Sequence, residues 1–268
     1  MRKLLIVANW KMNLNVEQAS LLVQRLHDRI KIQREVEIVL CPSLVCLQPI
    51  SMQIDRRKFR LGAQNAFYKD EGPYTGEVSF TMLRDLASYC IIGHSERRIY
   101  FQESLDTIRD KVAAAVRNDI VPILCVGENS HERQAGETKQ VLHDQITTGL
   151  SGLIAREIEE IVIAYEPLWA ISTFEGVKAK PDEVESAIKF IRLQVEELYG
   201  KKAAKAVRVL YGGSVDDQDV HGYLEVKGCD GALVGGASLN YYKFAGIITV
   251  AENIQHQVAK AKSTKKKS

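Results

Sequence analysis

The sequence predicts an α/β protein that folds as a single-domain (β/α)8 barrel, and three observations lead to this fold class. Eight short runs rich in β-branched residues alternate with longer segments whose apolar residues recur at helical spacing. The short runs are apolar almost throughout, which is typical of parallel strands covered by helices. The chain has 268 residues, 46% of them hydrophobic, and no Pro-, Gly- or Ser-rich linker interrupts it. This length suits one closed barrel and does not require a second domain.

We expect the strands to follow one another at regular intervals, with a helix after most of them. The expected strands are residues 4–8, 37–41, 60–63, 90–92, 121–126, 161–165, 207–210 and 231–234. The clearest expected helices are residues 16–30, 105–118, 138–150, 181–199 and 244–258. Pro181 opens the fourth of these helices, a position at which proline is tolerated. The barrel domain is therefore expected to span residues 1–258, followed by a lysine-rich, disordered tail over residues 259–268.

The charge balance argues against a nucleic-acid partner. The net charge is +2, but the last nine residues hold five of the 36 Lys and Arg residues, which leaves 31 basic against 34 acidic residues in the body. A protein that binds a phosphate backbone should instead have a basic face within its folded part. No apolar run is long enough to cross a membrane, and the first one, residues 4–8, is too short for a signal peptide.

The cysteines indicate the compartment. The chain has five cysteines, an odd number, with no Cys-x-x-Cys pair. This usage is typical of reduced thiols in a cytoplasmic protein and predicts neither a metal site nor a cysteine nucleophile.

Polar residues follow six of the expected strands. Active sites of such barrels lie on the loops after the strands, so these residues are expected to share one cleft. They are Asn9, Lys11, Gln64, Asn65, His94, Ser95, Glu96, Glu128, Glu166 and Ser214.

Glu166 is the most informative of them, because it ends a buried strand as a lone carboxylate. Partial loss of hydration there can make it a base that works at carbon. Alone, such a glutamate is more often a helix N-terminal carboxylate or a surface ion pair. The other strand-end residues favour the catalytic interpretation.

Two glycine pairs indicate a phosphate site. Gly212-Gly213-Ser214 follows the seventh strand, and Gly235-Gly236 follows the eighth, ahead of a short helix near Ala237. Glycine lets backbone N–H groups approach an anion, and these two loops are the usual phosphate site of the barrel. Either pair alone could be a tight turn that needs positive φ. A Rossmann alternative lacks its Gly-x-Gly-x-x-Gly signature.

Seven motifs resemble the triosephosphate isomerase family, in the same order and over residues 4–258. They are Asn9-Trp-Lys-Met-Asn, Gly62-Ala-Gln-Asn, Gly93-His-Ser-Glu-Arg-Arg, Ile123-Leu-Cys-Val-Gly-Glu, Ala164-Tyr-Glu-Pro-Leu-Trp, Tyr211-Gly-Gly-Ser and Leu233-Val-Gly-Gly-Ala-Ser. The resemblance implies interconversion of dihydroxyacetone phosphate and D-glyceraldehyde 3-phosphate, in glycolysis and gluconeogenesis. It also implies a cytoplasmic homodimer that needs no cofactor and no metal.

The resemblance also implies a role for each matching residue. Glu166 resembles the base and His94 the electrophile that hydrogen-bonds the carbonyl. Lys11 resembles the cation that offsets phosphate and oxyanion charge, with Asn9 as a donor beside it. The family is a standard worked example of this chemistry, in which the histidine acts as a neutral imidazole. Glu96 resembles a support residue that anchors Lys11.

Further positions in the family pattern bind phosphate or form the dimer. The resemblance places Ser172, Ser214, Gly235 and Gly236 at the phosphate, together with Asn9 and Lys11. Thr75 lies in a loop that resembles the arm entering the neighbouring subunit's pocket, near that subunit's copies of Asn9 and Lys11. Pro73, where the family often has alanine, stiffens this arm.

The lid after the sixth strand departs from the family pattern. The usual Ala-Ile-Gly-Thr-Gly-Lys-Thr-Ala-Thr-Pro is replaced by residues 170–181, which are two residues longer and carry Ser172 in place of the first glycine. Because lid closure excludes water and suppresses side reactions, we expect closure here to be slower or less tight than usual.

Two other functions compete. A phosphate-binding aldolase of the same fold would need a Schiff-base lysine on a strand, and Lys11 after the first strand is the only strand-end lysine. A non-catalytic scaffold would have no reason to keep Asn9, Lys11, His94 and Glu166 together.

Overall fold

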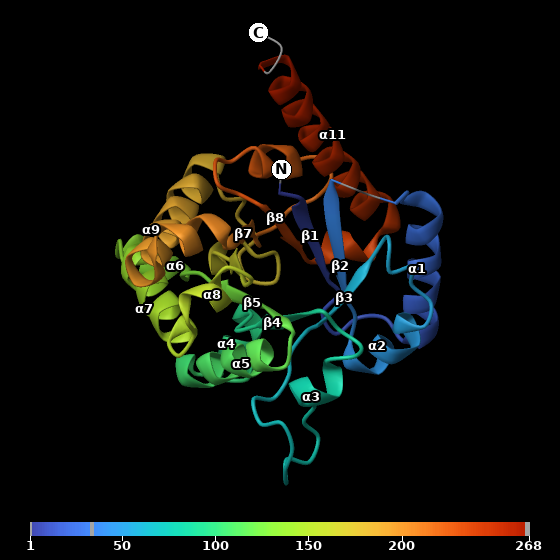
Figure 1. Ribbon diagram of the computed structural model, residues 1–268, viewed down its shortest axis with the longest axis horizontal. Helices are drawn as coiled ribbons and strands as arrows, with labels where there is room; N and C mark the ends of the chain where they lie inside the picture. The colour runs from blue at the N-terminus through green and yellow to red at the C-terminus, as the bar shows by residue number, and fades with distance from the viewer. Residues whose placement is uncertain (1, 33–34, 266–268) are drawn as a thin grey trace.

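The computed structural model describes residues 2–32 and 35–265, with side chains to residue 260. Eight parallel strands pair in sequence order and close into a barrel, with β1 beside β8 (Figure 1). The strands are β1 (Leu4–Asn9), β2 (Val36–Cys41), β3 (Arg60–Ala63), β4 (Tyr89–Ile92), β5 (Val121–Val126), β6 (Val162–Tyr165), β7 (Arg208–Tyr211) and β8 (Gly231–Val234). Each predicted strand is confirmed, with its ends displaced by at most one residue.

Helices surround the barrel. They are α1 (Val16–Arg29), α2 (Leu44–Ser51), α3 (Phe80–Leu83), α4 (Ser95–Tyr100), α5 (Leu105–Arg117), α6 (Ser130–Gln134), α7 (Thr138–Leu150), α8 (Ala155–Ile158), α9 (Pro181–Ala206), α10 (Val220–Leu224) and α11 (Tyr241–Lys265), with 3-10 turns η1 (Leu168–Ala170) and η2 (Gly236–Leu239). α9 runs beyond the predicted end at residue 199, although Gly200 breaks its helical geometry with φ 85°.

The expectation of disorder from residue 259 is corrected. α11 continues to Lys265 and projects from the barrel (Figure 1). Ala259, Lys260 and Ala261 are good helix formers, and no Gly or Pro stops the helix there. Residues 266–268 of the expected tail lie outside the described residues.

The core has two layers, and the alternation along the strands explains where the functional side chains lie. On β1, Leu5 and Val7 belong to the cluster inside the barrel, whereas Leu4, Ile6 and Ala8 pack toward the helices. Alternation places the next residue of the inner set, Asn9, at the mouth of the barrel. Val162 and Ala164 of β6 likewise face inward, so Glu166 continues the inner face.

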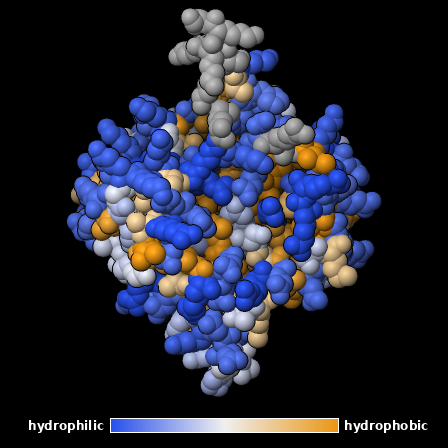
Figure 2. All heavy atoms as spheres, viewed as in Figure 1, coloured by the Kyte–Doolittle hydropathy of each residue, from blue (hydrophilic) through white to orange (hydrophobic). Residues whose placement is uncertain are grey.

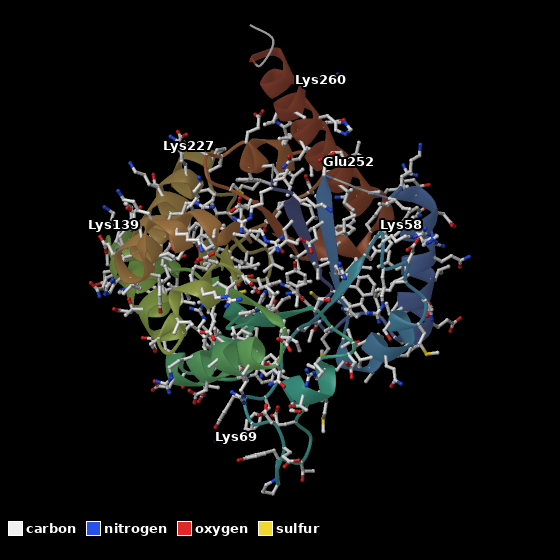
Figure 3. The ribbon with its side chains drawn as sticks, viewed as in Figure 1. Lys58, Lys69, Lys139, Lys227, Glu252 and Lys260 are labelled. Carbon is white, nitrogen blue, oxygen red and sulfur yellow. The ribbon has the colours of Figure 1, made fainter. Side chains whose placement is uncertain are left out.

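The outer surface is mainly hydrophilic, while apolar atoms show through toward the centre of the face in Figure 2. Lys58, Lys139 and Lys227 lie far apart around the outside of the molecule (Figure 3). Within the described part of the chain, no helix is both long and apolar enough to cross a membrane.

Candidate active site

A cavity of about 200 Å³ opens at the carboxyl ends of the strands. It brings together eight residues predicted from the sequence: Asn9, Lys11, His94, Glu166, Ser172, Ser214, Gly235 and Gly236. These residues come from the segments after five different strands and from the lid, over more than 220 positions of the chain. The predicted shared cleft is therefore present for this set.

Glu166 lies at the centre of the cavity and is nearly fully buried, with 2% of its surface exposed. One carboxylate oxygen, Oε1, is 3.3 Å from Nε2 of His94. The other, Oε2, accepts a hydrogen bond of 3.4 Å from the backbone N–H of Ser95. Gly212 makes room for this side chain, because a Cβ at Gly212 would lie 2.6 Å from Cγ of Glu166.

His94 is fixed by the helix that it precedes. It is the N-cap residue of α4, and its Nδ1 accepts a hydrogen bond of 3.3 Å from the backbone N–H of Glu96. Because Nδ1 accepts, a neutral ring carries its proton on Nε2. That nitrogen is the one nearest Glu166, so His94 can offer an N–H donor to an oxygen in the cavity.

Lys11 supplies the positive charge and is held in an uncommon backbone conformation, with φ 52°. Asn9 Oδ1 accepts a hydrogen bond of 3.1 Å from the Lys11 backbone N–H, and the Gln64 side chain donates to the Lys11 carbonyl at 2.9 Å. The Lys11 Nζ lies 2.6 Å from Oε1 of Glu96 and 3.0 Å from Oγ1 of Thr173 in the lid. These backbone and side-chain contacts hold Lys11 in its strained conformation.

Glu96 is outside the cavity lining and acts on it through Lys11. Partial burial alone would raise the pKa of this carboxyl, but hydrogen bonds and charges from Lys11, His94 and Thr173 lower the pKa below its ordinary value. Glu96 therefore stays charged opposite Lys11 near neutral pH, as a support residue should.

The predicted phosphate end combines exposed backbone with little side-chain bulk. A Cβ at Gly235 would stand 3.6 Å from Cε of Lys11, and η2 begins at the next residue, Gly236. The Ser214 backbone N–H donates to the Ala170 carbonyl at 2.8 Å. The Ser214 Oγ is buried without a hydrogen-bond partner among the described residues. Ser214 thus has its hydroxyl available, and its N–H becomes available only when the lid residue Ala170 moves.

The lid, residues 170–180, is folded over the mouth by its own turn and by contacts with the barrel. Gly176, with φ 67°, donates its N–H to the Ile171 carbonyl at 3.1 Å. Ser172 lines the cavity, is exposed and is not among the described residues with positive φ, so serine fits this backbone without strain. The substitution of glycine by Ser172 therefore leaves a usable backbone donor at this position.

Five strand-end residues expected in the cleft lie outside its lining: Ser95 and Glu96, which follow His94 in α4, and Gln64, Asn65 and Glu128, whose side chains bond other partners. Glu128 accepts hydrogen bonds from Tyr165 and Trp169 behind the cavity, at 3.0 to 3.2 Å. The Asn65 amide oxygen accepts from Lys111 at 2.7 Å, and Gln64 bonds backbone carbonyls. Their function is to shape the loops that carry the site.

Thr75 is also outside the cavity. It is exposed in the loop between β3 and α3, which projects from the body of the molecule (Figure 1).

Sequence reasoning missed several residues of the lining, of which four show why. Ile171 and Leu233 are buried apolar residues of the lining. Lys178 of the lid and Asp219 beside α10 form an ion pair of 2.5 Å at its edge. No sequence signal joins Lys178 to Asp219, because only the fold brings the lid next to α10. Among the described residues, no group of three or more His, Cys, Asp or Glu side chains could hold a metal ion.

A carboxylate, a histidine and a lysine surround one small cavity that ends in glycine-rich backbone. Such an arrangement at the carboxyl end of a closed barrel is typical of (β/α)8-barrel enzymes that perform acid–base chemistry.

Comparison with known proteins identifies the family. The model of the triosephosphate isomerase family matches residues 4–251. A triosephosphate isomerase of Dehalococcoides mccartyi strain BAV1 is 42% identical over 257 residues, 96% of this chain and 100% of the relative. That of Dictyoglomus turgidum is 43% identical over 249 residues, 92% and 99% of the two chains, and that of Clostridium tetani 42% identical, over 92% and 96%. The chain therefore belongs to the triosephosphate isomerase family.

Proposed function

We propose that this chain interconverts dihydroxyacetone phosphate and D-glyceraldehyde 3-phosphate by proton transfer through an enediolate. The single observation that carries this mechanism is the pairing of Glu166 and His94, whose reactive atoms lie 3.3 Å apart in the cavity. When Glu166 turns away from His94, a hydroxy-ketone in the cavity can have its carbon hydrogen next to the carboxylate and its carbonyl oxygen next to the N–H donor. The family assignment makes the chain an isomerase of glycolysis, and the same reaction serves gluconeogenesis.

The reaction requires two proton transfers at carbon. Glu166 removes a proton from C1 of the ketose, while the C2 carbonyl accepts hydrogen bonds from His94 Nε2–H and Lys11. His94 then moves the proton between the two enediolate oxygens, and Glu166 returns its proton to C2. In the structure Ser95 N–H occupies one carboxylate oxygen at 3.4 Å, so Glu166 must turn away from α4 to reach the substrate.

The phosphate group belongs at the opposite end of the cavity. Gly235, Gly236 and Ser214 provide backbone and hydroxyl donors, and Ser172 adds a donor from the lid. Lys11 lies between the two ends, where it offsets the charge of the phosphate and of the developing oxyanion. No cofactor or metal is needed for this chemistry.

The proposed base is tested by Glu166→Gln in an assay that couples the product to a dehydrogenase. General acid–base groups contribute about 10² to 10⁴ in rate, so kcat should fall at least about 100-fold while the KM for glyceraldehyde 3-phosphate changes little. Glu160→Gln, at an exposed turn position two residues before β6, should keep the parent rate. Full activity in Glu166→Gln would refute the proposed base.

A homodimer is supported by large apolar side chains that are exposed after β1, in α3 and at the end of α4. Met82, Tyr100 and Phe101 each expose 60% or more of their surface, and Met12 exposes 96%. Such a set favours an interface, because large apolar side chains gain by leaving water. A second copy would place Thr75 near the partner's Asn9 and Lys11. Light scattering should give about twice the 30.1 kDa mass of the chain, and the monomer mass at micromolar concentration would contradict the proposal.

The compartment and the remaining partners follow from composition. Four of the five cysteines are fully buried and all are free thiols, which suits a reducing cytoplasm. Outside the last nine residues the chain has 31 basic against 34 acidic residues, which supports the absence of a nucleic-acid partner.

A further inference from the structure

The two ends of the lid meet at one arginine that lies outside the active-site cavity. Arg133 belongs to the short helix α6, after β5. Its guanidinium carbon is 3.6 Å from the ring centroid of Trp169, which precedes the lid. The same guanidinium forms an ion pair with Glu183, which follows the lid in the first turn of α9.

Each of these partners is itself fixed to the barrel. The Trp169 indole N–H donates to Glu128 at 3.0 Å, and the ring is 3% exposed. Glu183 uses its other oxygen to accept a hydrogen bond of 2.8 Å from the Lys180 backbone N–H. Arg133 therefore contacts a residue that anchors the first hinge and a residue that anchors the last one.

The surroundings of Trp169 leave space for movement. A second cavity, of about 420 Å³, is lined by Arg133, Trp169, Glu128 and Glu183 behind the lid. When the first hinge turns, the indole can shift into this space while the planar guanidinium stays in contact with its face. A lysine ammonium group at the same place would keep the positive charge but would lack the planar surface that packs on the indole.

We infer that Arg133 is a positioning residue for the lid: it holds the two hinges at a fixed separation so that residues 170–180 close as one body. This role rests on the proposed isomerase function, because closure matters only where the lid must exclude water from the intermediate. The lid here is longer than the family pattern, and most of its residues are exposed. The position of the lid therefore depends mainly on its two hinges.

The experiment compares three variants with a matched control. Arg133→Met removes both contacts, Arg133→Lys keeps a charge for Glu183, and Glu183→Gln keeps an oxygen for Lys180 while it removes the ion pair. Arg156→Met changes an exposed arginine on α8, which belongs neither to the lid nor to its hinges. Each protein is assayed for kcat, KM and the fraction of turnover lost as methylglyoxal.

A second readout needs no turnover. The chain has two tryptophans, and Trp10 is fully buried. With 5-fluorotryptophan, the fluorine NMR spectrum therefore shows two resonances, and Trp169→Phe assigns them. Addition of glycerol 3-phosphate should move the Trp169 resonance in the parent and leave Trp10 unchanged.

The inference predicts a graded loss. Arg133→Met should lower kcat by about 10- to 100-fold, as expected for a displaced catalytic element, raise the methylglyoxal fraction and alter the Trp169 resonance. Arg133→Lys and Glu183→Gln should lie between this variant and the parent, and Arg156→Met should match the parent. A merely structural arginine would lower the melting temperature of Arg133→Met without these changes, and that result would overturn the inference. Failure of the proposed function would instead appear as an inactive parent or a fully active Glu166→Gln.

Discussion

The rim of the barrel and the lid above it are held in different ways. The rim residues Asn9, His94 and Glu166 are 2% to 6% exposed and end strands or cap a helix. Most lid residues are exposed, and they contact the barrel through side chains: Thr173 with Lys11 and Glu96, Glu175 with Ser130, and Lys178 with Asp219. The rim is therefore fixed by folding, whereas the lid is held by contacts that can be exchanged.

This difference matches the sequence. The rim follows the family pattern residue by residue, while the lid departs from it in length and at its tip. Acid–base geometry tolerates little displacement, but a lid can reach the same closed position through different contacts. Thr173 connects the lid to the rim, because it forms hydrogen bonds with both Lys11 and Glu96, the ion pair that a ligand must reach.

We expect the largest effect at Lys11, which lies at the rim and also contacts the lid. Lys11→Met removes the charge from the phosphate end and from the developing oxyanion, and loss of one such contact typically costs about 10²- to 10³-fold in kcat. Steady-state assays with both substrates measure this effect. Lys3→Met, at an exposed position, should keep the parent rate. A change below threefold in Lys11→Met would show that the lysine acts only in structure.

A smaller effect should follow from crowding the base without removing it. In Gly212→Ala the new methyl group would stand 2.6 Å from Cγ of Glu166, so the carboxylate must shift. We expect kcat to fall by about 10- to 100-fold, because misplacement of about 1 Å has that order of cost. Gly222→Ala is the matched control, because its nearest neighbour would be 3.8 Å away. Equal rates in the two variants would mean that the position of Glu166 is not restricted by this loop.

The rim was predictable from the sequence to a degree that the lid was not. The polar strand ends lead to Asn9, His94 and Glu166, because the barrel gathers the carboxyl ends of its strands whatever the loops do. Glu128 follows a strand in the same way but turns to Tyr165 and Trp169, and no local signal distinguishes it. The contacts of Lys178 and Arg133 depend on which segments the fold places side by side, and sequence spacing contains no such information.

We expect the altered lid to have a moderate effect on the fraction of the enediolate intermediate that is lost to a side reaction. If its longer tip closes less tightly, more enediolate phosphate loses its phosphate to form methylglyoxal. Replacement of residues 170–181 by the usual ten-residue lid should reduce the fraction of turnover lost as methylglyoxal, with kcat equal or higher. A fraction no greater in the parent than in the replacement would mean that the altered lid seals the site as well as the usual one.

The smallest effect concerns the ion pair beneath Thr173 and its dependence on pH. The pKa of Glu96 is lowered in the folded protein from an ordinary value of 4.5. The stability from its charged form is therefore fully present above that pH and is lost as the pH falls through the lowered pKa. Glu96→Gln lacks this dependence.

Urea unfolding at several pH values measures this difference. The parent should exceed Glu96→Gln in free energy of unfolding near neutral pH by under about 1 kcal/mol, since the pair is partly exposed, and the difference should shrink below about pH 4.5. The control is Glu160→Gln, because the Glu160 side chain makes no ion pair with a described residue. It measures how much the loss of an unpaired carboxylate changes the free energy of unfolding. A difference between parent and Glu96→Gln that stays constant with pH would mean that the lid and Lys11 do not stabilise the charged form of Glu96.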